Sequence, residues 1–199
     1  MGLMSGALAR AAKTPPRIER LFERTRSAEP RVKYAAAKAL RKISEERPQT
    51  IYPYFDDLLR LFENENTFLR WGATLTLGNL AAVDRDGRFE KVLDRFLAPI
   101  MGREMIGAAN VIIAASQIAA AQPHLAARIA SEILKVEQAV YKTPECRNIA
   151  IGHAIRALDR FTAVLPDCAP VLAFVTRQLS NPRQATRRKA ERFLKRWAA

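Results

Sequence analysis

Two histidines and two cysteines are the side chains of this chain best suited to acid–base or metal chemistry. His124 follows a proline at an expected helix start and His153 lies on the flank of a later helix, so we interpret both as surface or packed residues. Cys146 and Cys168 are too few for a disulfide framework and indicate thiols in a reducing compartment. Metalloprotease, serine-hydrolase and phosphate-loop motifs are absent from the sequence. We therefore expect no enzyme activity, catalytic residue, metal site or cofactor.

The two pairs of neighbouring carboxylates do not indicate a catalytic or metal site either. Asp56 and Asp57 fit an exposed helical segment, whereas Asp84 and Asp86 fall in a turn in which Gly87 suits a positive φ angle. Neither pair has the spacing of a calcium-binding loop.

Positive charge is the remaining chemical signal, because the chain carries a net charge of +13. Residues 1–47 contain 12 Lys/Arg against 5 Asp/Glu, residues 48–176 contain 13 against 14, and residues 177–199 contain 8 against 1. Basic ends of this kind favour an acidic partner or nucleic acid. The residues that we expect to contact phosphate or acidic groups lie near the C-terminal end: Arg187, Arg188, Arg192 and Lys195.

The elements that must position these residues are helices. Apolar residues recur at a spacing of three and four, as in the stripe from Phe89 to Ile100, and no window alternates with a period of two. Prolines and short polar turns divide the helices into pairs. The second helix of each pair carries two hydrophobic residues three positions apart, and the steps between successive couples are 37, 38, 43 and 36 residues. The couples are Leu40/Ile43, Leu77/Leu80, Ala115/Ile118, Leu158/Phe161 and Leu194/Trp197. A period near 40 with two helices per unit is typical of an α-solenoid.

Two segments carry a family resemblance. PRVKYAAAKAL from Pro30 to Leu40, and FLRWGATLTL from Phe68 to Leu77, resemble the second-helix signature of HEAT repeats. We therefore expect an all-α, right-handed α-solenoid of about five HEAT-like hairpins, in which the resemblance implies that the second helices line the concave face. The expected single repeat domain is 16–199, preceded by a leader at 1–15, with units at 16–47, 48–83, 88–122, 123–165 and 168–199.

Aligning the second helices on their couples selects the side chains opposite the core. These form a predicted partner-binding face that is basic at both ends and apolar in the middle. The residues are Tyr34, Lys38, Arg41, Trp71, Leu75, Ile113 and Arg156.

Three interpretations of that face stay open. It is either covered within the monomer, used as a groove for a protein or peptide segment, or used for homodimerisation. Electrostatic, weakly sequence-specific binding of nucleic acid through the basic ends is the alternative function. A third is the alkylpurine DNA glycosylase activity of some HEAT-like proteins, but no Asp stands beside Trp71 to match that family's catalytic residue. No stretch is long enough to span a membrane, and we expect a cytoplasmic binding module.

Overall fold

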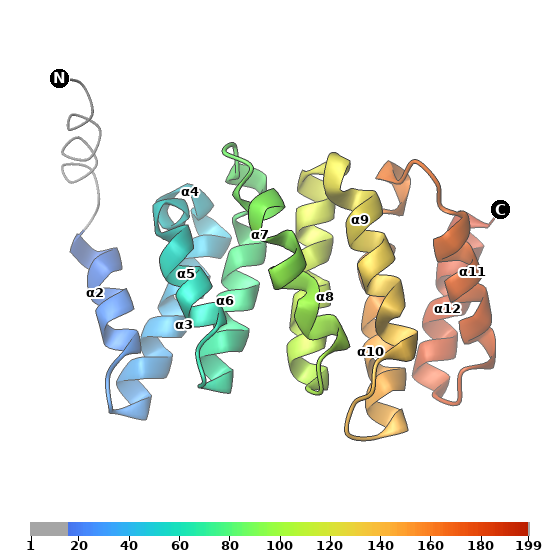
Figure 1. Ribbon diagram of the computed structural model, residues 1–199, viewed down its shortest axis with the longest axis horizontal. Helices are drawn as coiled ribbons and strands as arrows, with labels where there is room; N and C mark the ends of the chain where they lie inside the picture. Colours follow the sequence, from blue (N-terminus) through green and yellow to red (C-terminus); the bar gives the residue numbers. More distant parts are fainter. Residues whose placement is uncertain (1–15, 199) are drawn as a thin grey trace. The chain divides into compact units, whose positions relative to one another are not determined.

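The structure is a computed structural model that describes residues 16–198, and these fold into helices joined by short turns, with no strand in that range (Figure 1). The expected all-α fold is therefore confirmed. The predicted leader at 1–15 lies outside the described residues. The chain divides into two compact units, Met1–Leu80 and Ala81–Ala199, which we call unit 1 and unit 2.

Unit 1 holds two helical hairpins. Proline opens α3 and α4, where its missing N–H has no helical partner to lose. The Asn66 side chain starts the last helix by accepting hydrogen bonds from the backbone N–H groups of Phe68 and Leu69. The elements are α2 (Pro16–Thr25), α3 (Pro30–Glu46), α4 (Pro48–Ile51), η1 (Tyr52–Tyr54), α5 (Phe55–Phe62) and α6 (Thr67–Asn79).

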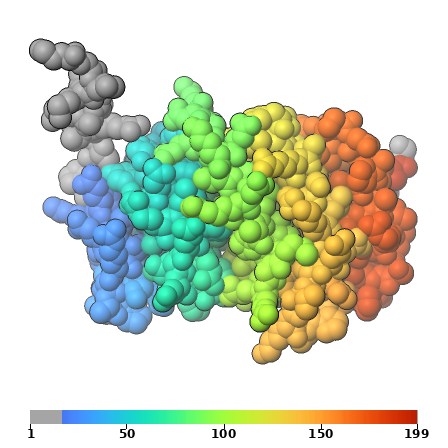
Figure 2. Space-filling view, in the orientation of Figure 1, coloured from blue at the N-terminus to red at the C-terminus, as the bar shows by residue number. Residues whose placement is uncertain are grey.

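Unit 2 continues the pattern, with a short 3₁₀ turn after each first helix. Its hairpins pack closely along their lengths in the space-filling view (Figure 2). The elements are η2 (Ala81–Val83), α7 (Arg88–Leu97), η3 (Ala98–Met101), α8 (Met105–Ala121), α9 (Pro123–Leu134), η4 (Lys135–Gln138), α10 (Pro144–Leu158), η5 (Thr162–Val164), α11 (Ala169–Arg177), η6 (Gln178–Ser180) and α12 (Gln184–Trp197).

The core forms from the residues that the helical periodicity selects. Phe89, Leu93 and Phe96 on α7 are completely buried, and so are Leu77 and Leu158 from the repeated couples. The last couple is looser, since Leu194 and Trp197 on α12 are only half-buried. Buried apolar area of this kind is the main stabilising contribution to each hairpin pair.

The turn before α7 shows how local chemistry sets a helix start. Gly87 has φ 62°, as its place after Asp86 predicts, and this left-handed conformation favours glycine. The Asp84 carboxylate accepts hydrogen bonds from the backbone N–H groups of Arg88 and Phe89. It also accepts one from the Gln122 side chain, which ties this turn to the end of α8.

Hydrogen bonds between successive hairpins of unit 2 recur at about one repeat length. The Tyr141 hydroxyl donates to the Ile100 carbonyl at 2.6 Å across 41 residues, and burial raises the pKa of this tyrosine to about 12. Thr186 donates to the Asn148 carbonyl across 38 residues. The repeat predicted from the hydrophobic couples therefore also appears in the polar contacts.

Within the described part of the chain, no helix is long and apolar enough to cross a membrane. Cys146 and Cys168 are both free. Residues 16–198 contain no group of three side chains that could hold a metal ion.

Candidate binding surfaces

Three aromatic rings meet on the second helices of unit 1. The Phe68 ring centroid lies 5.5 Å from that of Tyr34 on α3 and 5.4 Å from that of Trp71, one turn further along α6. Phe68 is 63% exposed and Tyr34 is 37% exposed, while Trp71 is half-buried. We call Tyr34, Phe68 and Trp71 the aromatic cluster. It offers a partner a large apolar contact whose rings already support one another.

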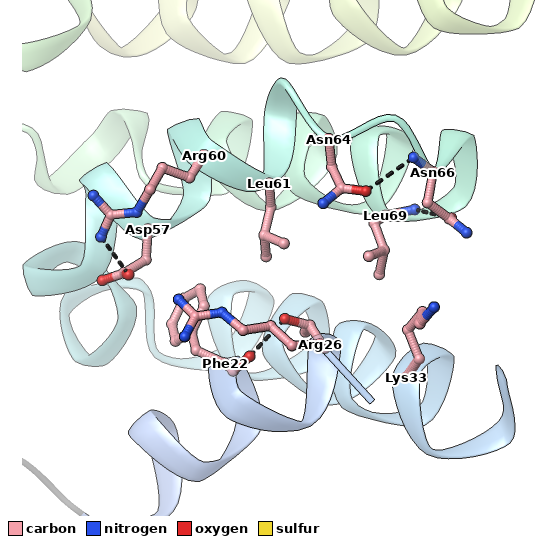
Figure 3. A pocket seen from close by; sticks show the side chains of 10 residues that line it. Phe22, Arg26, Lys33, Asp57, Arg60, Leu61, Asn64, Asn66 and Leu69 are labelled. Atoms are coloured by element: carbon pink, nitrogen blue, oxygen red, sulfur yellow. Dashed lines mark hydrogen bonds and ion pairs between the residues drawn. The ribbon is translucent and has the colours of Figure 1, made fainter. Parts of the chain in front are cut away.

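A pocket of about 400 Å³ adjoins this cluster between the two hairpin turns of unit 1 (Figure 3). Asn66 links the two features, because its amide lines the pocket and donates a hydrogen bond to the Tyr34 hydroxyl. Arg26, Lys33 and Arg60 bring three positive charges to its walls. We call this cavity the loop pocket.

One carboxylate opposes these charges. Asp57 accepts a hydrogen bond from Arg60 at 2.6 Å, so these two residues largely neutralise each other. Arg26 and Lys33 have no carboxylate partner among the described residues. The loop pocket therefore carries a net positive charge that suits a carboxylate.

The predicted residues of unit 1 all lie on α3 and α6. Lys38 is exposed, and Arg41 pairs with Glu45 one turn further on at 2.9 Å. Trp71 and Leu75 are half-buried, so they are a less open surface than the alignment of helices suggested. The Trp71 indole Nε1 is buried without a hydrogen-bond partner. An unpartnered buried donor is uncommon and costs stability.

In unit 2, α10 and α12 present cations in place of aromatic rings. Two adjoining pockets of about 390 and 230 Å³ are lined by Arg156 on α10, Arg160 in the turn after α10, and Lys189 and Arg192 on α12. We call these four residues the cationic cluster. No described carboxylate forms an ion pair with any of them.

Close helix packing brings these charges together. A Cβ atom at Gly152 of α10 would lie 2.9 Å from the Lys189 Nζ and 2.9 Å from the Thr186 Oγ1, so glycine lets α12 approach here. Burial lowers the pKa of Lys189, and the charges of Arg156, Arg183 and Arg192 lower it further. Crowding of like charges is therefore a property of this surface.

His153 lies beside the cluster, on the wall formed with Ile113 and Ser116 of α8. Burial lowers its pKa, with further contributions from Lys189 and Arg156. The predicted residues Ile113 and Arg156 thus line the same pocket in unit 2, whereas Trp71 and Leu75 belong to unit 1.

The four residues predicted on α12 differ in their solvent exposure and in their hydrogen bonds within the chain. Arg188 and Lys195 are exposed, and Arg192 lines the smaller pocket. Arg187 instead donates hydrogen bonds to the carbonyls of Asn181 and Pro182, and so closes the turn before its own helix. The Arg187 guanidinium therefore has fewer N–H groups left for a partner than those of Arg188 and Arg192.

Sequence reasoning missed the residues of the loop pocket, Arg160, and three further residues of these surfaces. Phe68 was part of the HEAT-like segment but was not selected, because it lies one turn before the aligned positions. Lys189 and His153 were not selected because their neighbours come from other helices. A periodic pattern places a residue on a helix, but the distance between two helices is set by packing.

Comparison with known proteins supports the architecture. No family model and no curated protein matches the chain. An engineered protein from the Northeast Structural Genomics Consortium superposes with a TM-score of 0.55 at 14% identity, covering 90% of this chain and 78% of the other. A designed armadillo repeat protein superposes with a TM-score of 0.52 at 17% identity, covering 93% and 87%. The chain therefore has the fold of a helical repeat solenoid.

Proposed function

We propose that the chain is a non-catalytic binding module that captures an acidic protein segment on unit 1. The aromatic cluster seats an apolar side chain of the segment, and the loop pocket receives a neighbouring carboxylate. The observation that carries this proposal is the 63% exposure of Phe68 within a packed group of three rings. Aromatic anchors dominate the energetics of many protein interfaces.

The charge of the loop pocket favours an apolar segment that also carries acidic residues. Arg26 and Lys33 of the loop pocket have no carboxylate partner among the described residues, and Lys38 is exposed on the same helix as Tyr34. A carboxylate placed in this pocket gains charge-assisted hydrogen bonds. A basic segment would meet repulsion there.

Selection of peptides from a random library on the full-length chain tests the proposal. We expect the enriched peptides to combine an aromatic or large aliphatic residue with Asp or Glu. Phe68→Ala should weaken their binding about ten- to a hundredfold, because the exposed anchor ring is lost.

Val140→Ala is the matched control. Val140 is 78% exposed in unit 2, so this variant also removes an exposed apolar side chain but leaves the aromatic cluster intact. Equal loss in both variants, or enrichment of basic peptides, would contradict the proposal. A homodimer that Phe68→Ala dissociates in sedimentation experiments would assign the cluster to self-association instead.

Nucleic-acid binding is a second candidate, favoured by the exposed Arg188 and Lys195 on α12. Several other cations of this region are already paired, since Arg183 contacts Glu145 and Arg196 contacts Asp159. Duplex DNA binding at physiological salt that Arg188→Gln and Lys195→Gln abolish would support this candidate.

A further inference from the structure

A group of cations without carboxylate partners among the described residues lies where α10 and the turn after it face α12. Arg156 lines both adjoining pockets, with Lys189 and Arg192 on one side and Arg160 on the other. Neighbouring α8 adds no charge, because Met105–Ala121 contains no Asp, Glu, Lys, Arg or His. Four cations thus line two neighbouring pockets, with Arg156 between them.

The one carboxylate in the lining of these pockets is already occupied. Asp159 accepts a hydrogen bond from the Trp197 indole at 2.7 Å and one from Arg196 at 3.4 Å. Arg196 therefore offsets the Asp159 charge, and the four cations of the cluster are left without a counter-charge from the described chain.

We propose that the cationic cluster of Arg156, Arg160, Lys189 and Arg192 binds a dianionic phosphomonoester group. This inference concerns unit 2 and does not rest on the function proposed for unit 1. Arginine guanidinium groups present planar pairs of N–H donors that match phosphate oxygens, and an ammonium adds a compact charge. A dianion would offset most of the repulsion among the four cations.

The arrangement favours a monoester over a nucleic-acid backbone. The four cations lie around two neighbouring pockets, and Arg156 lines both of them, so they form a compact group centred on Arg156. A phosphodiester backbone has single charges spaced along its length and is bound by cations that follow it as a track. A phosphomonoester carries two negative charges on one group, and this matches a cluster that holds several positive charges close together.

Isothermal titration of the full-length chain with inorganic phosphate tests the site, with chloride at equal ionic strength as the reference. We expect saturable binding of one phosphate per chain at up to about millimolar concentration. The double variant Lys189→Gln with Arg192→Gln should weaken it about ten- to a hundredfold, because charge-assisted hydrogen bonds are lost.

The matched control is Arg188→Gln with Lys195→Gln. It removes the same charge from the same helix, but at exposed residues that do not line the pockets. This control should keep phosphate binding within about twofold. An equal loss of phosphate affinity in both double variants would mean that only the net charge of the chain matters, and it would overturn the proposal. The absence of saturable binding would overturn it as well.

Proton NMR of the two histidines locates the bound ion. The His153 resonances should move on phosphate addition, because His153 lies beside Arg156 and Lys189, while those of the exposed His124 on α9 should stay in place. Equal shifts of the His153 and His124 resonances would contradict binding at the cationic cluster.

Two further ligands identify the source of the group. A phosphoserine peptide that binds more tightly than free phosphate indicates a phosphorylated protein, whereas the reverse order indicates a small phosphorylated ligand; both agree with the site. Duplex DNA that displaces phosphate, and whose binding falls equally in the two double variants, would indicate a phosphodiester track and overturn it.

Discussion

The two tryptophans of the chain lie one in each unit, and their indole N–H groups have different surroundings. Trp71 in unit 1 packs against Phe68 and its Nε1 is buried without a partner. Trp197 in unit 2 donates to Asp159 at 2.7 Å and stacks with the Arg196 guanidinium at 4.9 Å. The second helices of unit 1 thus form an apolar surface whose indole donor has no partner. The last second helix of unit 2 instead joins its indole to a polar network with cations around it.

This contrast shows how a repeat fold separates architecture from function. The buried side of each second helix is mainly apolar in both units, with a few hydroxyl side chains, because it must pack on its neighbours. The other side is free to vary, so the aromatic cluster occupies part of it in unit 1 and the cationic cluster occupies it on α10 and α12 in unit 2.

Replacing one helical glycine in each unit should change stability in opposite directions. Gly72→Ala should stabilise unit 1 by about 0.5–1 kcal/mol, because a new Cβ meets nothing within 4 Å and alanine favours a helix. Gly152→Ala should destabilise unit 2 by about 1–2 kcal/mol, because its Cβ would collide with Thr186 and Lys189. Urea denaturation measures both, and changes of the same sign would contradict the close approach of α10 and α12.

The tryptophans should respond differently to the loss of their N–H groups. Trp197→Phe should cost about 1–2 kcal/mol, because Asp159 loses its 2.7 Å hydrogen bond. Trp71→Phe should cost less, about 0.5 kcal/mol, because removing an unmet donor offsets part of the lost contact area. Denaturation midpoints compare the two variants, and a larger loss for Trp71→Phe would mean that its N–H has a partner after all.

Relief of charge crowding should stabilise the fold of unit 2 slightly. Lys189→Gln should raise the free energy of unfolding by about 0.5 kcal/mol at low salt, because burial of the charge and repulsion from Arg156, Arg183 and Arg192 both lower the pKa of Lys189. The gain should shrink as salt is added. The equivalent change in unit 1, Lys38→Gln, should have no such effect.

The smallest expected effect concerns pH. Burial, together with Lys189 and Arg156, lowers the pKa of His153 from its ordinary value of 6.5, so the unfolded chain binds this proton more readily than the folded chain does. Stability should therefore fall as the pH drops below about 6.5, and His153→Gln should flatten that dependence. Thermal melts between about pH 5.5 and 7 measure the slope. His124→Gln is the control, and an equal change in slope would argue against the role of the cluster.

Most of the fold could be predicted because helical periodicity and turn chemistry are local. Pro30 and Pro144 open helices where expected, and Leu77 and Leu158 are buried as their spacing predicts. The binding surfaces were predicted only in part. Tyr34, Trp71 and Arg156 were selected by alignment, but the contact of Phe68 with Tyr34 joins two helices. The approach of Lys189 to Gly152 also depends on a packing distance that no single-helix pattern contains.

The composition of α8 has a consequence for how unit 2 opens. This helix has no charged residue, its Ser116 hydroxyl bonds back to the Ile113 carbonyl, and it packs against both α9 and α10. Most residues between Ala108 and Ala119 are buried against those neighbours, so local fraying offers their amides little exchange with solvent. In hydrogen–deuterium exchange, the amides in the middle of α8 should be the slowest of unit 2 and should report its global unfolding.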